Sequence, residues 1–228
     1  MTLRYEGKKV LVTCVERYMG NVIADGFEQE GAEVVRDSDL LVSESALEDL
    51  ADRAKDIDIL VANFAEDPMP NRVDDILDEE LDTLFQHMVF PLIRTVRRFV
   101  PAMKAKGKGK IIAMTSASPL RGIPKFSAYC SARGAQNAFV RAAGLELAAD
   151  NIQFNAIAQH YVKNERYFPD ELIESERFKA RVLPQIPTGK IAEAEETAEL
   201  ALYLASDKCT HMVGQVIPWS GGWATTTG

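Results

Sequence analysis

Residues 10–20 read VLVTCVERYMG, and this stretch decides the fold. The run begins as an apolar strand, VLVT, and reaches Gly20 just before a helix-like segment, NVIADGFEQEGAEV. A strand, a turn and a helix near the N-terminus form the unit that carries a glycine-rich phosphate loop in α/β folds that bind dinucleotides. Most of those glycines are missing here. Cys14 and Tyr18 stand where small residues are expected, and only Gly20 remains.

Strand-like and helix-like segments alternate along the whole chain. The strand-like segments are near-continuous apolar runs, as in strands buried on both faces of a parallel sheet; they span residues 8–13, 32–36, 57–63, 110–116, 152–158 and 214–219. Helical patterns cover residues 81–106, 128–150 and 196–207, with Pro91 expected near a bend. The alternation predicts an α/β fold with a doubly wound, mostly parallel, Rossmann-like sheet, in a single domain of residues 1–228.

The interval between the second and third strands is short. About twenty residues separate 32–36 from 57–63, and they hold one helical pattern, SALEDLADRAK, preceded by the apolar run DLLVS. Parallel neighbours need a connection of a dozen or more residues, so DLLVS cannot be an ordinary parallel strand joined to 32–36 by a helix. We therefore predict a truncated region after the second strand, where a dinucleotide site would surround the adenine and its ribose.

Composition argues against several classes of partner. The chain has 228 residues, 46% hydrophobic and 26% charged, with a net charge of −8, which is ordinary for a soluble globular protein and disfavours binding to nucleic acid or to an anionic membrane. No apolar run approaches the roughly 20 residues of a membrane-spanning helix, and no signal-peptide pattern is present, so a cytoplasmic location is expected. Cys14, Cys130 and Cys209 show neither disulfide nor metal-ligand spacing, and no metal is predicted.

Three polar residues form a candidate catalytic group. Ser116 ends the strand-like run KIIAMTS, and Tyr129 and Arg133 follow in the helical segment SAYCSARGA. Tyr129 and Arg133 are four residues apart, so they share one face of their helix, and Ser116 is expected at the sheet edge where open α/β sheets bind ligands. A nearby guanidinium favours the phenolate form of a tyrosine, and a serine hydroxyl can hold a substrate oxygen. The group predicts acid–base chemistry on a substrate hydroxyl.

Over almost its full length the chain resembles the short-chain dehydrogenase/reductase family, in the segments VLVTCVERYMG, LVAN, KIIAMTSAS, SAYCSARGA and VGQVIPWSGG. That family combines a serine and a Y-x-x-x-K motif with a T-G-x-x-x-G-x-G loop and an N-N-A-G segment. This sequence departs at each place: Arg133 replaces the lysine that also binds the nicotinamide ribose, Cys14 and Tyr18 replace loop glycines, and Ala-Asn-Phe-Ala stands at 62–65. A tyrosine at position 18 would fill the space where the backbone approaches a pyrophosphate.

Together these departures resemble the halohydrin dehalogenases, a cofactor-free branch of the same fold. The resemblance implies that Tyr129, as phenolate, takes the proton from the hydroxyl of a vicinal haloalcohol, that Ser116 hydrogen-bonds the oxygen, and that Arg133 stabilises the phenolate. The oxygen then displaces halide from the neighbouring carbon and gives an epoxide. In reverse, small anions such as azide, cyanide or nitrite would open epoxides. The resemblance implies that the enzyme needs no cofactor and that it forms a homotetramer.

The resemblance also implies a halide site where the nicotinamide of a reductase would lie. Its residues come mainly from the loop after the strand IQFNAIA, joined by a tyrosine of the former phosphate loop: Tyr18, Gln159, His160, Tyr161, Val162, Phe168 and Pro169. Phe64 and Pro68 would line the substrate pocket. We expect Tyr18 to face the catalytic pocket beside Tyr161, and no dinucleotide to fit over Gly20.

Two other functions stay open. An NAD(P)-dependent reductase could tolerate the altered loop, and Asp37 lies about seventeen residues after Gly20, close to where an acidic residue binds an adenosine ribose. We interpret Asp37 as a turn residue instead, because the region around it is short. The second alternative is a non-catalytic scaffold of the same fold. The presence of Ser116, Tyr129 and a cationic partner at working spacing argues against it.

Two features are left unassigned by the sequence. Some halohydrin dehalogenases carry an acid directly after the asparagine of the LV-x-N segment, whereas this chain has Phe64, so the proton could leave through Glu66, Asp67 or water. Near the C-terminus, Trp219 or Trp223 could reach the site of a neighbouring subunit, although a core position is at least as good an explanation for Trp219.

Overall fold

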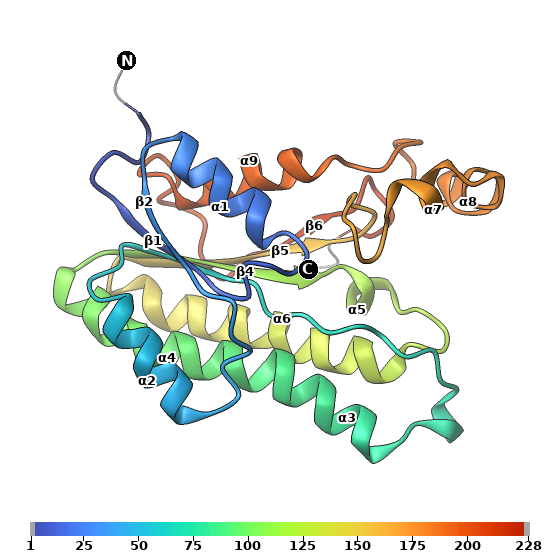
Figure 1. Ribbon diagram of the computed structural model, residues 1–228, viewed down its shortest axis with the longest axis horizontal. Helices are drawn as coiled ribbons and strands as arrows, with labels where there is room; N and C mark the ends of the chain where they lie inside the picture. Colours follow the sequence, from blue (N-terminus) through green and yellow to red (C-terminus); the bar gives the residue numbers. More distant parts are fainter. Residues whose placement is uncertain (1–2, 226–228) are drawn as a thin grey trace.

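The computed structural model describes residues 3–225, and its strands form one parallel sheet (Figure 1). Their order is β2-β1-β3-β4-β5-β6, and their bounds are β1 Lys9–Val12, β2 Glu33–Arg36, β3 Ile59–Ala62, β4 Gly109–Ser116, β5 Ile152–Gln159 and β6 Val216–Trp219. The predicted doubly wound α/β fold is confirmed. The longest pairing joins β4 to β5 and places Ser116 opposite Gln159 at the carboxyl edge.

Helices cover both faces of the sheet (Figure 1). On one face lie α1 (Gly20–Gln29) and α9 (Ala194–Ala205), which pack against each other; on the other lie α2 (Glu44–Arg53), α4 (Phe90–Lys106) and α6 (Ser127–Ala148). Each layer encloses its own apolar core. Because both faces are covered, every residue of β3 and β4 is buried, which explains why these strands read as continuous apolar runs.

The link between β2 and β3 contains one helix and no strand. Residues 37–43, which include DLLVS, form an irregular segment, and Leu41 is buried there with a positive φ of 52°. Helix α2 begins after Ser43, whose hydroxyl oxygen accepts a hydrogen bond from the Ala46 amide (3.2 Å). This is the usual way to satisfy a free N–H at a helix start. The short interval therefore holds a crossover helix alone.

The helix predicted over residues 81–106 is interrupted. Its first part is α3 (Asp78–Leu84), followed by one π-helical turn (Phe85–Val89) and then α4. Pro91 was expected near a bend, and a π-helical turn ends at Val89, two residues before it. The irregularity is the π-helical turn, a single-turn insertion of the kind that interrupts α-helices.

Long connections gather at the carboxyl edge of the sheet. Residues 63–77 follow β3, the short helix α5 (Ser118–Arg121) follows β4, and a long segment after β5 carries α7 (Asp170–Glu174) and α8 (Glu176–Arg181). These connections lie at the edge where open α/β sheets bind ligands. Within residues 3–225, no helix is both long and apolar enough to span a membrane.

Candidate active site

The three residues of the candidate catalytic group meet at the carboxyl edge of β4. Ser116 is the last residue of β4, and Tyr129 and Arg133 lie in the first turns of α6. Arg133 Nε donates a hydrogen bond to Tyr129 Oη (3.0 Å). The Ser116 hydroxyl donates to Ser118 Oγ (2.9 Å) and accepts from the Ser118 amide (3.1 Å). A substrate oxygen would compete with Ser118 for the Ser116 proton.

Arg133 is a buried cation whose hydrogen-bond partners within residues 3–225 are all neutral. Its side chain is almost fully enclosed, and Nη1 donates to the carbonyls of Phe64 (3.1 Å) and Met114 (3.3 Å) and to Gln136 Oε1 (2.9 Å). Burial alone would lower the pKa of Arg133, but the nearby Tyr129 and Tyr167 oxygens raise it, so the guanidinium stays charged. A buried charge without a counter-ion is costly, so this one favours an anion in the adjoining space.

A cavity of about 210 Å³ opens beside this group, and we call it the catalytic cavity. Its lining brings together segments from the three connections that follow β3, β4 and β5: Pro68, Thr115, Ser116, Ser118, Ile123, Phe126, Tyr129, Arg133, Gln159, His160, Tyr161, Val162, Asn164, Tyr167 and Phe168. Most of its wall is apolar or aromatic, and the polar groups are few. That is the usual character of a site for a small organic molecule.

One wall of the catalytic cavity is aromatic. The His160 ring stacks on Trp223 (centroids 4.1 Å apart, planes 25° from parallel) and meets Tyr161 and Phe168 edge to face. Burial, with a smaller effect from the charge of Arg121, lowers the pKa of His160 to about 4, so the imidazole is neutral near pH 7. Aromatic edges carry partial positive charge. Such a wall suits a large, weakly hydrated anion.

The cleft above the sheet is crossed by contacts among the three connections that follow β1, β3 and β5. Tyr167 Oη donates to the Glu66 carbonyl (2.8 Å), and Arg166 forms an ion pair with Asp67 (Nε to Oδ1 2.8 Å). The Tyr18 ring stacks on Tyr167, and Tyr18 Oη donates to Asp67 Oδ1 (3.3 Å). Burial raises the pKa of Tyr18 to about 12 and that of Tyr167 further above its ordinary value. Both rings are therefore neutral phenols.

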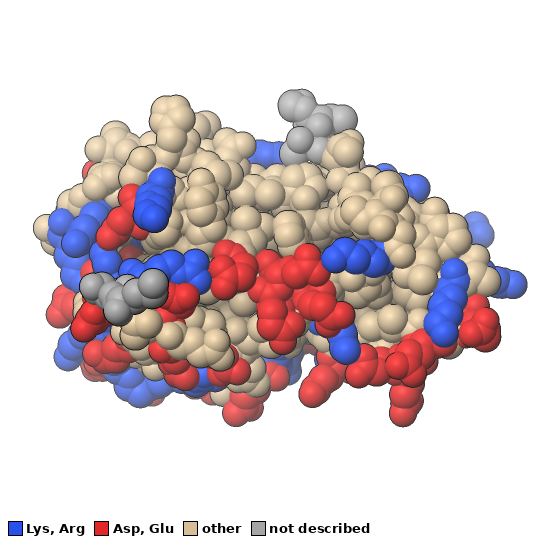
Figure 2. All heavy atoms as spheres, turned by 90° about the horizontal axis from the view of Figure 1, so that it is seen from above, with Lys and Arg blue, Asp and Glu red and all other residues tan. Residues whose placement is uncertain are grey.

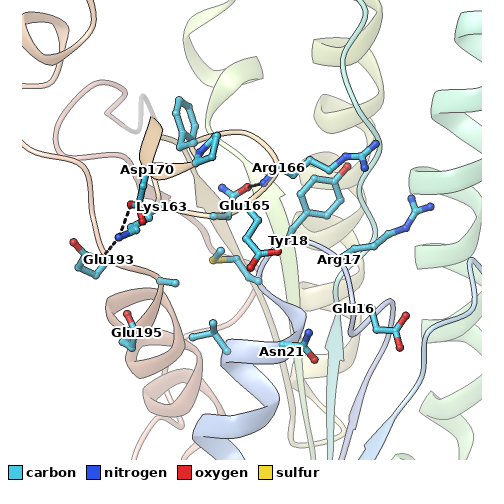
Figure 3. A pocket seen from close by; sticks show the side chains of 16 residues that line it. Glu16, Arg17, Tyr18, Asn21, Lys163, Glu165, Arg166, Asp170, Glu193 and Glu195 are labelled. Atoms are coloured by element: carbon cyan, nitrogen blue, oxygen red, sulfur yellow. Dashed lines mark hydrogen bonds and ion pairs between the residues drawn. The ribbon is translucent and has the colours of Figure 1, made fainter. Parts of the chain in front are cut away.

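A second, larger space of about 760 Å³ lies on the other side of these contacts, over the start of α1 (Figure 3), and we call it the outer pocket. Its charged lining consists of Glu16, Arg17, Lys163, Glu165, Arg166, Asp170, Glu193 and Glu195. Each cation already has an acidic partner: Lys163 pairs with Asp170 (2.7 Å), as Arg166 does with Asp67, and Arg17 lies 3.5 Å from Glu66. The outer pocket is thus acidic at the place where a phosphate loop binds anions.

Most of the expected site residues lie around the catalytic cavity, and three lie elsewhere. Tyr18 was expected beside Tyr161, but it lines the outer pocket, because Tyr167 stands between it and the cavity. Pro169 lines only the outer pocket. Phe64 is fully buried in the core beneath α4 and does not line the cavity; only its carbonyl oxygen serves the site, through Arg133. Pro68, the other residue expected in the substrate pocket, does line the catalytic cavity.

The loop between β1 and α1 keeps a glycine-like backbone without the glycines. Cys14 and Tyr18 have positive φ values of 46° and 51°, in the left-handed region that residues other than glycine rarely adopt. Gly20 has a different role. A Cβ added there would lie 2.3 Å from the Val15 carbonyl oxygen, so Gly20 allows α1 to pack closely against its own loop.

Asp37 follows β2, and its carboxylate already has a partner. Arg53 of α2 donates to Asp37 Oδ1 (2.7 Å), while the side chain of Asp37 is almost fully buried. Burial is the main effect on this carboxyl and raises its pKa. Asp37 therefore anchors α2 to the end of β2, and a ribose would have to displace Arg53 to reach it.

Neither acid suggested for the proton route contacts the catalytic group. The Glu66 carboxylate hydrogen-bonds His87 Nδ1 (2.7 Å) and lies near Arg17, while Asp67 binds Arg166 and Tyr18. The pKa of Glu66 is lowered: burial opposes this, but the hydrogen bonds from His87 and the Asp67 amide outweigh it. Neither Glu66 nor Asp67 is therefore assigned to the path by which the proton leaves Tyr129.

The sequence analysis missed Ser118, Asn164 and Tyr167. Asn164 Oδ1 accepts the amides of Arg166 (3.0 Å) and Tyr167 (2.7 Å), which fixes the turn that presents Tyr167 to the cavity. An asparagine in a connection is a recognisable turn signal, because its side chain hydrogen-bonds the backbone about two residues further on. It does not reveal which connection the ring will meet. In residues 3–225, no group of three or more His, Cys, Asp or Glu side chains is placed to hold a metal ion.

A family model described as Enoyl-(Acyl carrier protein) reductase matches residues 3–224. The chain belongs to the short-chain dehydrogenase/reductase superfamily. D-beta-hydroxybutyrate dehydrogenase of Rhizobium meliloti (strain 1021) is 32% identical over 160 residues, which cover 67% of this chain and 62% of that enzyme. L-xylulose reductase of Bos taurus is 28% identical over 99% of this chain and 100% of that enzyme. The chain therefore spans about three fifths of the first relative and all of the second.

Solved structures similar to this chain include enzymes of different chemistry. One described as a dehalogenation enzyme is 27% identical, with a TM-score of 0.86 over 97% of this chain and 100% of the other. A halohydrin dehalogenase bound to ethyl (2S)-oxiran-2-ylacetate is 23% identical, with a TM-score of 0.84 over 97% of this chain and 99% of the other. A gluconate 5-dehydrogenase from Burkholderia cenocepacia in complex with NADP and tartrate is 22% identical, with a TM-score of 0.86 over 97% of each chain. The last two show the fold alone, so activity is argued from the site.

Proposed function

We propose that this short-chain dehydrogenase/reductase homologue is a cofactor-independent halohydrin dehalogenase that converts vicinal haloalcohols to epoxides. The observation that carries the proposal is the Arg133–Tyr129 pair: a buried guanidinium without a carboxylate partner donates to the phenol that faces the cavity. Such a cation stabilises a phenolate, which is the base that the reaction needs.

In the proposed reaction, Tyr129 accepts the proton of the substrate hydroxyl while Ser116 donates a hydrogen bond to the same oxygen. The oxygen forms a bond to the neighbouring carbon as the carbon–halogen bond breaks, and halide leaves with the bonding pair. The halide would then lie against the aromatic wall of His160 and Tyr161. The reverse reaction would open an epoxide with a small anion such as azide, cyanide or nitrite. No electron transfer is involved, so no nicotinamide takes part.

Two further observations support a reaction without a dinucleotide. The cleft above β1 and β3 is crossed by the stacked rings of Tyr18 and Tyr167 and by the Arg166–Asp67 ion pair. The outer pocket over α1 is acidic, whereas a pyrophosphate needs N–H donors and cations. The solved dehalogenation enzyme, which is 27% identical, supports the removal of a halogen.

The proposal is tested by mixing the purified protein with 1-bromo-2-propanol in the absence of any cofactor and following the release of bromide and of protons. Equal release of both is expected. Replacing Tyr129 by Phe removes the base and should lower kcat/KM by roughly 10²–10⁴-fold, the usual effect of losing acid–base catalysis. Replacing the exposed Tyr203 of α9 by Phe is the matched control and should leave the rate unchanged.

The competing function is an NAD(P)-dependent oxidoreductase, which the names of the curated relatives favour. The same protein is therefore titrated with NADH and NADPH. Absence of bromide release together with tight binding of either nucleotide would contradict the dehalogenase proposal. If neither bromide release nor nucleotide binding is found, a scaffold without catalytic activity is favoured instead.

A further inference from the structure

The catalytic cavity and the outer pocket are neighbours with one partition between them. Asn164 and Phe168 line both spaces. Tyr167 lines the catalytic cavity and Tyr18 the outer pocket, and their ring centroids lie 4.8 Å apart with the planes 29° from parallel. We infer that this stacked pair, the tyrosine pair, limits the length of the substrate. The inference rests on the proposed function for its substrate class.

Both rings of the tyrosine pair are fixed at their hydroxyl ends. Tyr167 Oη donates to the Glu66 carbonyl (2.8 Å), and Tyr18 Oη donates to Asp67 Oδ1 (3.3 Å). Asp67 is itself held by Arg166, whose side chain extends above Tyr18 along the rim of the outer pocket (Figure 3). Swinging either ring away would break one of these hydrogen bonds and the stack. The partition is therefore a built wall and not a pair of free side chains.

The catalytic cavity is partly open, and its volume sets the size of the molecule that it can enclose. At the roughly 30 Å³ that a water molecule takes up in the liquid, a cavity of about 210 Å³ holds on the order of seven non-hydrogen atoms. A haloalcohol such as 1-bromo-2-propanol is within this limit, whereas 1-bromo-2-octanol exceeds it. The substrates are therefore short-chain vicinal haloalcohols and the matching small epoxides.

Removing one ring should join the two spaces. Tyr167→Ala deletes the ring that faces the catalytic cavity and opens it toward the 760 Å³ of the outer pocket. Tyr18→Gly deletes the ring on the other side. Residue 18 has a φ of 51°, which glycine adopts without strain. Tyr18→Gly therefore keeps the loop backbone, and it provides a second variant if Tyr167→Ala fails to fold.

The test compares kcat/KM for bromide release from 1-bromo-2-octanol and from 1-bromo-2-propanol. We expect the octanol-to-propanol ratio to rise at least tenfold in Tyr167→Ala and in Tyr18→Gly. Tyr203→Ala on the exposed face of α9 should leave the ratio near that of the unaltered protein. Tyr167→Phe keeps the ring but loses the hydrogen bond to the Glu66 carbonyl, so its ratio should lie between that of the unaltered protein and that of Tyr167→Ala. A ratio unchanged in both ring-deletion variants would overturn the inference.

A second measurement separates the partition from the proposed function. Trp223 stacks on His160, a lining residue of the catalytic cavity, so its fluorescence reports binding of unreactive 1-propanol and 1-octanol. We expect the ring-deletion variants to bind 1-octanol at least tenfold more tightly than the unaltered protein does, with little change for 1-propanol. If the unaltered protein releases no bromide, the function proposal fails while this result still supports the partition. Unchanged 1-octanol binding counts against the partition alone.

Discussion

Arg133 shows why an arginine is not equivalent to a lysine at this position. Its Nη1 serves three neutral acceptors, the carbonyls of Phe64 and Met114 and the amide oxygen of Gln136, while its Nε faces Tyr129. A lysine ammonium is a compact point charge and cannot reach acceptors on several sides in this way. The guanidinium therefore links the ends of β3 and β4 to α6 and holds the phenol in the same arrangement. Its uncompensated charge is then directed at Tyr129 and the cavity.

His160 predicts a pH dependence of stability. Its pKa is about 4 in the folded protein and about 6.5 in an unfolded chain. Between these values the unfolded state binds the extra proton, so the His160 contribution is complete above pH 6.5 and is lost as the pH falls toward 4. His160→Phe keeps the aromatic stack on Trp223 and cannot titrate. The pH-dependent loss should shrink by roughly 1–3 kcal/mol in this variant, since each pKa unit corresponds to about 1.4 kcal/mol.

The measurement is the free energy of unfolding from urea titrations at several pH values between 4 and 7. Carboxylates also titrate toward the acid end of this window, so the informative quantity is the difference between His160→Phe and the unaltered protein at each pH. His211→Phe, at an exposed position, is the matched control and should leave the pH profile in place. Parallel profiles for His160→Phe and the unaltered protein would show that His160 is not buried in its neutral form.

At the scale of the element, Gly20 and Gly26 of α1 predict opposite outcomes for the same substitution. A Cβ at position 20 would meet the Val15 backbone, with the carbonyl oxygen at 2.3 Å, whereas a Cβ at position 26 would touch Leu202 and Ala198 at 3.5 and 3.6 Å. Gly20→Ala should therefore cost roughly 1–3 kcal/mol, as overpacking does. Gly26→Ala should stabilise the protein by about 0.5–1 kcal/mol, because alanine favours the helix.

Thermal and urea unfolding of the two alanine variants check this pair. The expected order of stability is Gly26→Ala above the unaltered protein and Gly20→Ala below it. Neither Gly20 nor Gly26 lines the catalytic cavity, so bromide release at a temperature where all three proteins are folded should change little. A Gly20→Ala variant as stable as the unaltered protein would mean that the loop after β1 moves easily, and that Gly20 is not needed for close packing.

The elements that the sequence reveals are those whose environment is uniform along their length. β4 is buried at every position, so its apolar run and its end at Ser116 can be recognised without the fold. The π-helical turn of Phe85–Val89 is different, because one turn of altered spacing inside a helical pattern leaves its apolar residues in place. The helix over 81–106 therefore reads as continuous. DLLVS is apolar because Leu41 packs into the core, and not because it pairs in the sheet.

The candidate site divides in the same way. Ser116, Tyr129 and Arg133 are positioned by one strand end and one helix face, so their meeting follows from local spacing. Tyr18 is different, because its neighbour Tyr167 is held by an asparagine turn in a distant connection and by the loop after β3. No local pattern predicts that contact. The sequence therefore predicts that Tyr18 fills the space of a pyrophosphate, but it does not predict which pocket the Tyr18 ring will line.

At the scale of the whole molecule, the charge distribution opposes a dinucleotide. Figure 2 looks onto the face covered by α1 and α9 and shows Asp and Glu side chains gathered across its centre. The outer pocket lies over the start of α1, and its cations are already paired with acids. A pyrophosphate placed there would face unpaired carboxylates, and like charges brought together in an interface cost several kcal/mol.

We therefore predict that NADH and NADPH bind with Kd values above about 1 mM, which corresponds to less than about 4 kcal/mol of binding free energy. The dinucleotide would have to displace the stacked rings of Tyr18 and Tyr167, break the Arg166–Asp67 pair and remove Arg53 from Asp37. Titration calorimetry measures the binding, with the gluconate 5-dehydrogenase of Burkholderia cenocepacia, whose structure holds NADP, as the positive control. A Kd below about 100 μM would contradict the prediction. It would mean that both connections open together, and that the cleft is closed only in the absence of nucleotide.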